Sequence, residues 1–252
     1  VRLIDRGTRK IRLTNEGMLL RRRAEEIIQL VDKTEQELLG QNEQVEGKIT
    51  IGCGEIAAVQ ILSDLIKSFT EKYPRVTFDF FTATADFVKE QMDKGLIDIG
   101  LLLEPIDIEK YEFVRLNTKE HWVVLMPPSD PLAEKEHISA KELSKLPLIL
   151  PRRLQVQSEL ASWFGDYYKN LHVVFTSNLN TNGAIMVEKG LAYSVVIDGM
   201  LSLWDQSKIT YRPLYPVLTA TSVFAWKRGK PFSLATTKFI EHAKCFLGMG
   251  NA

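Results

Sequence analysis

The sequence predicts an α/β protein of two lobes, preceded by a long N-terminal helix. Strand and helix patterns alternate from residue 47 onward, which is typical of sheets covered by helices. Proline-marked breaks at Pro147 and Pro151, followed by a late strand near 221–226, indicate that the chain leaves one sheet and later returns to it. Two lobes joined by two crossings enclose a cleft, where open α/β sheets bind ligands.

Composition excludes several classes of protein. The 252 residues are 45% hydrophobic and carry 32 basic and 32 acidic side chains, so the chain has enough apolar side chains for a folded core. No apolar run reaches the ~18 residues that a membrane crossing needs. The two cysteines, Cys53 and Cys245, are far apart, which argues against a disulfide framework or a Cys-rich zinc site.

The N-terminal end gives two expectations about the whole protein. The first residues are charged and contain no apolar signal core, so we expect a cytoplasmic protein. The chain also begins without Met and in the middle of a pattern, so we expect it to be a piece of a longer protein.

The first element is a basic turn followed by a long helix. Ile11-Arg12-Leu13 alternates like a strand, and Thr14 is placed to cap a helix that extends to about Gln44. Apolar positions from Leu13 onward are spaced alternately by four and three residues, which is the heptad seam of paired helices. We therefore expect dimerisation through this face, at Leu20, Ala24, Ile27, Val31 and Leu38.

Charge is divided sharply within this segment. Residues 1–23 carry eight basic and two acidic side chains, whereas residues 24–46 carry one basic and seven acidic side chains. A basic end of this kind can bind phosphates, although a polar split is equally typical of a solvated helix. The alternative for the seam is a helix that lies on its own domain.

The remaining elements follow in order along the chain. Strands are predicted at 48–53, 75–82, 97–103, 121–126, 146–150, 172–176, 191–197, 209–214 and 221–226. Helices are predicted at 57–73, 85–94, 140–145, 157–169, 182–189 and 233–247. This alternation implies parallel sheets with helices on both faces.

Polar residues at the ends of the predicted strands are candidates for a ligand pocket. Glu55, Thr82, Thr84 and Glu104 would line one lobe, while Arg152, Asn178 and 180–182 would line the other. Arg152 would pair with a carboxylate if it points inward, and the adjacent Arg153 is expected to face solvent. The Asn-rich segment is equally compatible with a turn that caps a helix.

One motif has an enzymatic interpretation. Gly52-Cys53-Gly54-Glu55-Ile56-Ala57 fits the dinucleotide fingerprint G-x-G-x-x-A, with Asp79 or Asp86 as the acidic partner. However, Glu55 would place a carboxylate beside a pyrophosphate. The same turn has a milder use, because helix N-terminal amides near 54–57 can hold a small anion.

No other pattern indicates catalysis or a metal. The four histidines, His121, His137, His172 and His242, lie on separate elements without the spacing of metal ligands. Cys53 lies among apolar neighbours and is expected to be a buried, inert thiol. We therefore expect no catalytic residue, no metal and no cofactor.

The residues together resemble the LysR family of transcriptional regulators. Arg6-Gly7-Thr8-Arg9-Lys10-Ile11-Arg12-Leu13-Thr14-Asn15-Glu16-Gly17 resembles the end of that family's winged helix-turn-helix, running into its linker helix. Segments 47–52, 69–76 and 95–100, then 129–133 and 187–192, resemble the family's effector-binding domain in order and spacing. The resemblance covers essentially the whole chain.

The resemblance implies a fold and a function. The effector domain would have the two-lobed fold of periplasmic binding proteins, and a small molecule in its cleft would alter how an oligomer binds promoter DNA. The implied divisions are a wing remnant at 1–13, a linker helix at 14–46, a first lobe at 47–148 and 222–252, and a second lobe at 149–221. A homodimer or homotetramer is expected, with DNA as the partner of the full-length protein and no membrane.

Carried over residue by residue, the resemblance also implies two sites. The effector site comprises Gly54, Glu55, Ile56, Thr82, Thr84, Asp86, Leu103, Glu104, Arg152, Asn180, Thr181 and Asn182. The wing residues Arg6, Thr8, Arg9 and Lys10 would contact the DNA backbone.

The sequence departs from the family in two respects. The helices that read bases are absent from this chain, so specific operator binding by this chain alone is not expected. At Ile56 many members carry Ser or Thr, and Glu55 lies beside it, so a simple anionic effector is in doubt. The alternatives to it are a cationic, a zwitterionic or a sugar-like effector. The alternatives are an exported-type solute-binding protein of the same fold and, less favoured, a nicotinamide-dependent enzyme.

Overall fold

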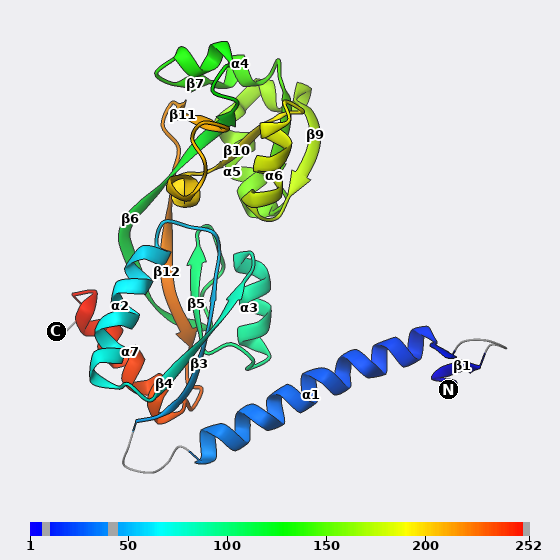
Figure 1. Ribbon diagram of the computed structural model, residues 1–252, viewed down its shortest axis with the longest axis vertical. Helices are drawn as coiled ribbons and strands as arrows, with labels where there is room; N and C mark the ends of the chain where they lie inside the picture. Colours follow the sequence, from blue (N-terminus) through cyan, green and yellow to red (C-terminus); the bar gives the residue numbers. More distant parts are fainter. Residues whose placement is uncertain (7–10, 40–44, 249–252) are drawn as a thin grey trace.

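A long helix projects from a body of two stacked lobes in the computed structural model (Figure 1). The structure describes residues 1–6, 11–39 and 45–248. Among the helices of these ranges, none combines the length and hydropathy that a membrane crossing requires.

Helix α1 (Asn15–Leu39) begins where the sequence predicts and continues to the last described residue of this segment. The Thr14 hydroxyl accepts a hydrogen bond from the Gly17 backbone N–H at 3.0 Å, which caps the first turn. The short strands β1 (Ile4–Arg6) and β2 (Ile11–Leu13) pair antiparallel just before it. The predicted continuation to Gln44 falls on residues 40–44, outside the described residues.

The first lobe is an α/β sheet that contains most of the predicted elements. Its strand order is β4-β3-β5-β12-β6. The strands are β3 (Gly47–Cys53), β4 (Val76–Thr82), β5 (Ile99–Leu103), β12 (Thr219–Lys227) and the first part of β6 (Tyr111–Met126). The helices are α2 (Val59–Lys72), α3 (Ala85–Asp93) and α7 (Leu234–Phe246).

The second lobe is built around the other end of β6. Its sheet contains β8 (Pro147–Pro151), β9 (His172–Ser177), β10 (Tyr193–Ile197) and β11 (Thr210–Tyr215), with the short β7 (Ile138–Ser139) beside β11. The α-helices are α4 (Ala140–Leu143), α5 (Leu154–Phe164) and α6 (Asn180–Glu188). The 3-10 helices are η1 (Pro131–Glu134), η2 (Gly165–Asn170) and η3 (Asp198–Leu203).

The sheets are mixed rather than purely parallel, which corrects the sequence expectation. Strands β3, β4 and β5 are parallel, but β12 is antiparallel to both β5 and β6. The reason is topological: β6 carries the chain out of the first lobe and β12 carries it back, so the two crossing strands run in opposite directions. Residues 111–120, the first ten of β6, were not predicted to be a strand.

The position of the first crossing also differs from the expected division at residue 148. Residues 122–126 of β6 already pair with β10 and β11, and the segment from η1 to α4 packs with them in the second lobe. Residues 122–148 therefore belong with the second lobe. A single strand shared by two sheets carries no break in its pattern to mark this boundary.

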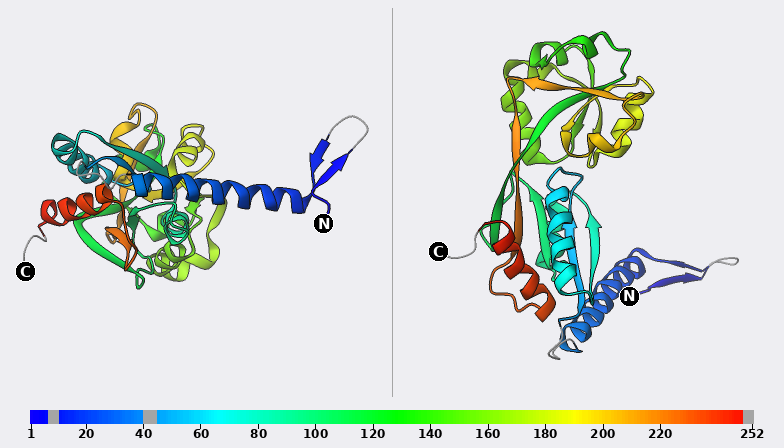
Figure 2. Two further views of the ribbon diagram at one scale, coloured as in Figure 1. Left: turned by 90° about the horizontal axis from the view of Figure 1, so that it is seen from below. Right: turned by 60° about the vertical axis from the view of Figure 1, so that its left-hand side comes forward.

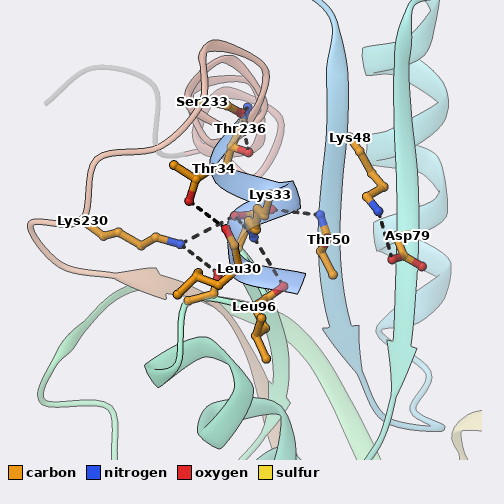
Figure 3. Close-up of polar contacts among 12 residues, drawn as sticks. Leu30, Lys33, Thr34, Lys48, Thr50, Asp79, Leu96, Lys230, Ser233 and Thr236 are labelled. Atoms are coloured by element: carbon orange, nitrogen blue, oxygen red, sulfur yellow. Dashed lines mark hydrogen bonds and ion pairs between the residues drawn. The ribbon is translucent and has the colours of Figure 1, made fainter. Parts of the chain in front are cut away.

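Helix α1 docks on the first lobe through a buried ion pair. Lys33 Nζ lies 2.7 Å from Asp98 Oδ1, and the Asp98 side chain is only 2% exposed. Thr50 donates its backbone N–H to Asp98 at 3.0 Å, and Lys230 Nζ lies 3.9 Å away. Figure 3 shows Lys33, Lys230 and Thr50 converging from three segments. The right-hand view in Figure 2 shows α1 leaving the body at this lobe, distant from the second.

Candidate functional site

A small cavity lies between the two lobes, where the strand ends of both sheets meet. Its volume is about 80 Å³. The first lobe contributes 54–56, 83–85, Leu101 and Leu103, and the second contributes 151–153, Val156 and 178–180. Trp122, Val196 and Ile197 complete the lining.

The structure brings seven of the twelve predicted effector-site residues to this cavity: Gly54, Glu55, Ile56, Thr84, Leu103, Arg152 and Asn180. The other five, Thr82, Asp86, Glu104, Thr181 and Asn182, lie outside its lining. Three of these five hold the surrounding structure in place. Asp86 and Thr181 contact the opposite lobe, and Glu104 forms an ion pair with Arg115 at 2.7 Å. The Arg115 guanidinium keeps the pKa of the Glu104 carboxyl below its usual range.

Glu55 joins the first lobe to the second. Its carboxylate accepts the backbone N–H of Asn180 at 2.8 Å and the hydroxyl of Thr181 at 2.5 Å. These groups form the first turn of α6, where unpaired amides and the helix dipole favour a negative charge. Glu55 therefore acts as an N-terminal cap for a helix of the opposite lobe.

Arg153, rather than Arg152, is the arginine that points inward, which reverses the expectation from sequence. Its Nε donates to Asp86 Oδ2 at 3.0 Å, its Nη1 donates to the Leu103 carbonyl at 3.0 Å, and its Nη2 donates to the Pro105 carbonyl. The Arg153 side chain is 8% exposed, whereas Arg152 is an exposed residue of the cavity lining. Arg153 lies just before α5 and holds the second lobe against the first.

Gly199 brings the two backbones into contact at a third point. A Cβ atom built on Gly199, in η3, would lie 2.2 Å from the backbone N of Ala57 and 2.5 Å from the carbonyl C of Ile56. Because these are backbone atoms, any larger residue at position 199 would push the lobes apart at this contact.

Sequence reasoning missed Glu120, which is fully buried at the crossing between the lobes. Its two carboxylate oxygens accept the backbone N–H groups of Ala57 and Ala58, at 2.9 and 3.0 Å, in the turn that leads into α2. Burial raises the pKa of the Glu120 carboxyl, although the two amides oppose this change. Glu120 precedes the strand predicted at 121–126, so no pattern marked it as an inward-facing group.

Packing explains the glycine fingerprint without a dinucleotide. A Cβ atom on Gly52 would lie 2.3 Å from Val88 Cγ1, so Gly52 is needed for the close approach of α3. The amides that would hold a pyrophosphate are bonded to Glu120. Of the proposed acidic partners, Asp79 is exposed and Asp86 pairs with Arg153. This geometry does not favour nicotinamide binding.

The other predicted residues lie on the N-terminal arm. Leu20, Ile27 and Val31 are exposed on α1, and Ala24 is partly exposed. Leu38 is within the helix, but its side chain lies outside the description, as do Thr8, Arg9 and Lys10 altogether. Arg6 ends strand β1.

Cysteine and metal chemistry add little at the site. Cys53 is buried, and burial raises the pKa of its thiol. Within residues 1–6, 11–39 and 45–248, no cluster of three or more His, Cys, Asp or Glu side chains is arranged to hold a metal ion.

Comparison with known proteins agrees with this architecture. The model of the LysR substrate-binding domain matches residues 42–247. The HTH-type transcriptional regulator YvbU of Bacillus subtilis is 29% identical over 98% of this chain and 84% of its own length.

Two solved structures share the fold. The LysR-family regulator CbnR, solved with its target DNA, covers 94% of this chain and 83% of its own at 16% identity and a TM-score of 0.73. The effector-binding domain of QuiR, solved with shikimate, covers 82% of this chain and all of its own at 16% identity and a TM-score of 0.69.

Proposed function

The chain belongs to the LysR family of transcriptional regulators, and from this premise we propose that it senses a small molecule in the cavity between its lobes. The observation that carries the proposal is the cavity itself, lined from both lobes and crossed by the Glu55 and Arg153 contacts. A ligand that contacts both lobes there would change how they sit on each other.

In this proposal, the two lobes and the N-terminal end of the chain have separate roles. QuiR carries its ligand in an effector-binding domain, and CbnR is solved on target DNA. We infer that the two lobes here bind the effector and that DNA is bound through the N-terminal end of the full-length protein. Arg6, Thr8, Arg9 and Lys10 would contact the DNA backbone there.

The exposed apolar seam of α1 supports assembly into an oligomer. Leu20, Ile27 and Val31 are all at least half exposed. A row of exposed apolar side chains at heptad spacing is costly in water and favours pairing with a second copy of the helix.

The experiment that tests the sensor is a thermal unfolding panel. The midpoint would be measured with amino acids, small carboxylates, small amides, sugars and NAD(H). A ligand at a hundredfold excess over Kd stabilises the folded state by about 2.7 kcal/mol, which raises the midpoint by about 5–10 °C for a chain of this size. We expect one class of metabolite to do this and NAD(H) to have no effect.

A cavity-filling variant localises the response. A Cβ atom on Gly54 meets its neighbours only at ordinary contact distances of 3.5 Å or more, so Gly54→Leu extends into the cavity without a backbone clash. We expect it to abolish the metabolite shift. A shift with NAD(H) alone would favour the enzyme, and a metabolite shift that survives Gly54→Leu would place the ligand outside the cavity.

A further inference from the structure

Two helix N-termini at the cleft already carry carboxylates of the protein itself. The amides before α2 donate to Glu120, and the first turn of α6 donates to Glu55. Helix N-termini favour anions because their first amides lack partners and the dipole is positive there. At these two helix N-termini, a bound anion would have to displace a carboxylate.

One residue of the cavity wall has a buried donor without a partner. Trp122 is 3% exposed and lines the cavity, and its Nε1 has no hydrogen-bond partner among the described residues. Buried polar atoms are nearly always bonded, so an orphaned donor calls for a ligand or an ordered water. The other two orphaned atoms, Glu159 Oε2 and Ser222 Oγ, belong to residues that do not line the cavity.

The rest of the wall around Trp122 is largely apolar. Ile56, Leu101, Leu103, Val156 and Val196 lie around the same space. A largely apolar wall with one buried, unpaired donor favours a ligand that is mostly hydrocarbon and carries an acceptor.

We propose that the cavity takes an uncharged, largely apolar ligand whose acceptor oxygen receives the Trp122 indole N–H. This inference rests on the proposed function and names the chemical class of its effector. The resemblance to the family alone implies only that the effector is a small molecule.

The charges around the cavity support an uncharged ligand. Glu55 would repel an anion, and Arg153 is committed to Asp86 and two backbone carbonyls. Arg152 is the remaining cation of the lining, but it is exposed, and exposed charges contribute little because water screens them. A simple alkylammonium ligand would lack the acceptor that Trp122 needs.

The size of the ligand follows from the space. A cavity of about 80 Å³ has room for about five water-sized groups, since each needs about 15 Å³. A molecule of about six non-hydrogen atoms therefore suits the closed cleft. Isobutyramide and isobutyrate share one branched acyl skeleton of six non-hydrogen atoms and differ in charge, so they are matched probes. Isobutylamine keeps the branched chain but carries a positive charge and no acceptor oxygen.

The experiment follows the Trp122 indole N–H directly by nuclear magnetic resonance. The ¹⁵N-labelled chain contains four tryptophans, and the Trp122 indole peak is the one that disappears in Trp122→Phe. We expect isobutyramide to move this peak downfield in the wild-type chain. Its Kd should be about tenfold lower than that of isobutyrate or isobutylamine, as expected when one buried hydrogen bond is gained and no buried charge is left unpaired.

Two variants control the result. Trp122→Phe should weaken isobutyramide binding, measured on the backbone amides of the cavity, by about tenfold. Trp163→Phe removes an indole that already donates to the Pro216 carbonyl outside the cavity, and should leave binding unchanged.

Three results would overturn the inference: equal or tighter binding of isobutyrate or isobutylamine, unchanged binding in Trp122→Phe, or no movement of the indole peak with any probe. None of these three results would contradict the proposal that the cavity senses a small molecule. An anionic metabolite whose thermal shift is lost in Gly54→Leu would keep the sensor and refute the neutral ligand. A panel in which no shift depends on Gly54 would instead count against the cavity as the sensing site.

Discussion

At the scale of single residues, the cleft is governed by two carboxylates that occupy helix N-termini. Glu120 and Glu55 both accept backbone N–H groups at the start of a helix, but their surroundings differ. Glu120 is fully buried on a strand that crosses between the lobes, whereas Glu55 bridges from the first lobe to α6. Burial disfavours the charged form of Glu120, so the protein bears a cost at the crossing in order to satisfy the amides before α2.

This cost predicts a pH dependence. A carboxyl whose pKa is raised on folding contributes stability that is fully present below its unfolded pKa, near 4.5, and is lost as pH rises through the folded pKa. The free energy of unfolding of wild type minus that of Glu120→Gln should therefore fall as pH rises from 4.5 to 8. The fall is about 1.4 kcal/mol for each unit by which the folded pKa exceeds the unfolded one.

Urea unfolding across this pH range measures the difference. Asp198 opposes and His121 favours ionisation of Glu120, and both residues remain in the variant. Glu71→Gln, on the exposed face of α2, is the control and should show no such trend. A difference that grows with pH would contradict this account of Glu120.

At the scale of elements, α1 presents one face to the first lobe and another to solvent. Lys33 and Glu26 contact the lobe, through Asp98 and Lys94, while the seam residues Ile27 and Val31 remain exposed. The solvent face is therefore available to a second copy of the helix.

The seam predicts that Ile27→Asp dissociates the oligomer, because a charge would be buried against its symmetry mate. Sedimentation at micromolar concentration should show the monomer mass, 28.7 kDa, for this variant and at least twice that mass for wild type. Gln29→Asp places the same charge away from the seam and should keep the wild-type mass. An Ile27→Asp chain that sediments like wild type would rule out pairing through this face.

Much of the element pattern could be predicted from sequence. Alternating strands and helices, the Thr14 cap and the strand-end position of Gly54–Ile56 are local properties of the chain. The antiparallel return of β12 and the shared strand β6 depend on long-range topology, which periodicity does not record.

The site residues that could not be predicted from sequence also depend on how the chain is arranged in three dimensions. Whether Arg152 or Arg153 points inward depends on the backbone direction where β8 turns into α5, and nothing in the residue types decides it. Glu120 and Trp122 face the cleft only because β6 passes between the lobes. Charged and aromatic residues in a strand are otherwise typical of a half-exposed surface.

At the scale of the whole molecule, two strands carry the chain across and three contacts hold the lobes together. Strands β6 and β12 form the crossing, and Glu55, Arg153 and Gly199 make the contacts. The Lys33–Asp98 ion pair then ties the first lobe to α1. Movement of the second lobe on the first therefore changes its position relative to α1, the helix that we propose pairs the subunits.

The most direct test of this account is the distance between spin labels at positions 67 on α2 and 169 in η2, measured by double electron–electron resonance. The exposed Cys245 is first replaced by Ser, while the buried Cys53 is retained. We expect one narrow distribution in the labelled protein, and a longer, broader one when Glu55→Ala and Arg153→Ala are combined. The control pair Glu71→Ala and Lys145→Ala, exposed in the two lobes, should leave the distribution narrow. Identical distributions with and without Glu55 and Arg153 would contradict the claim that these residues hold the cleft closed.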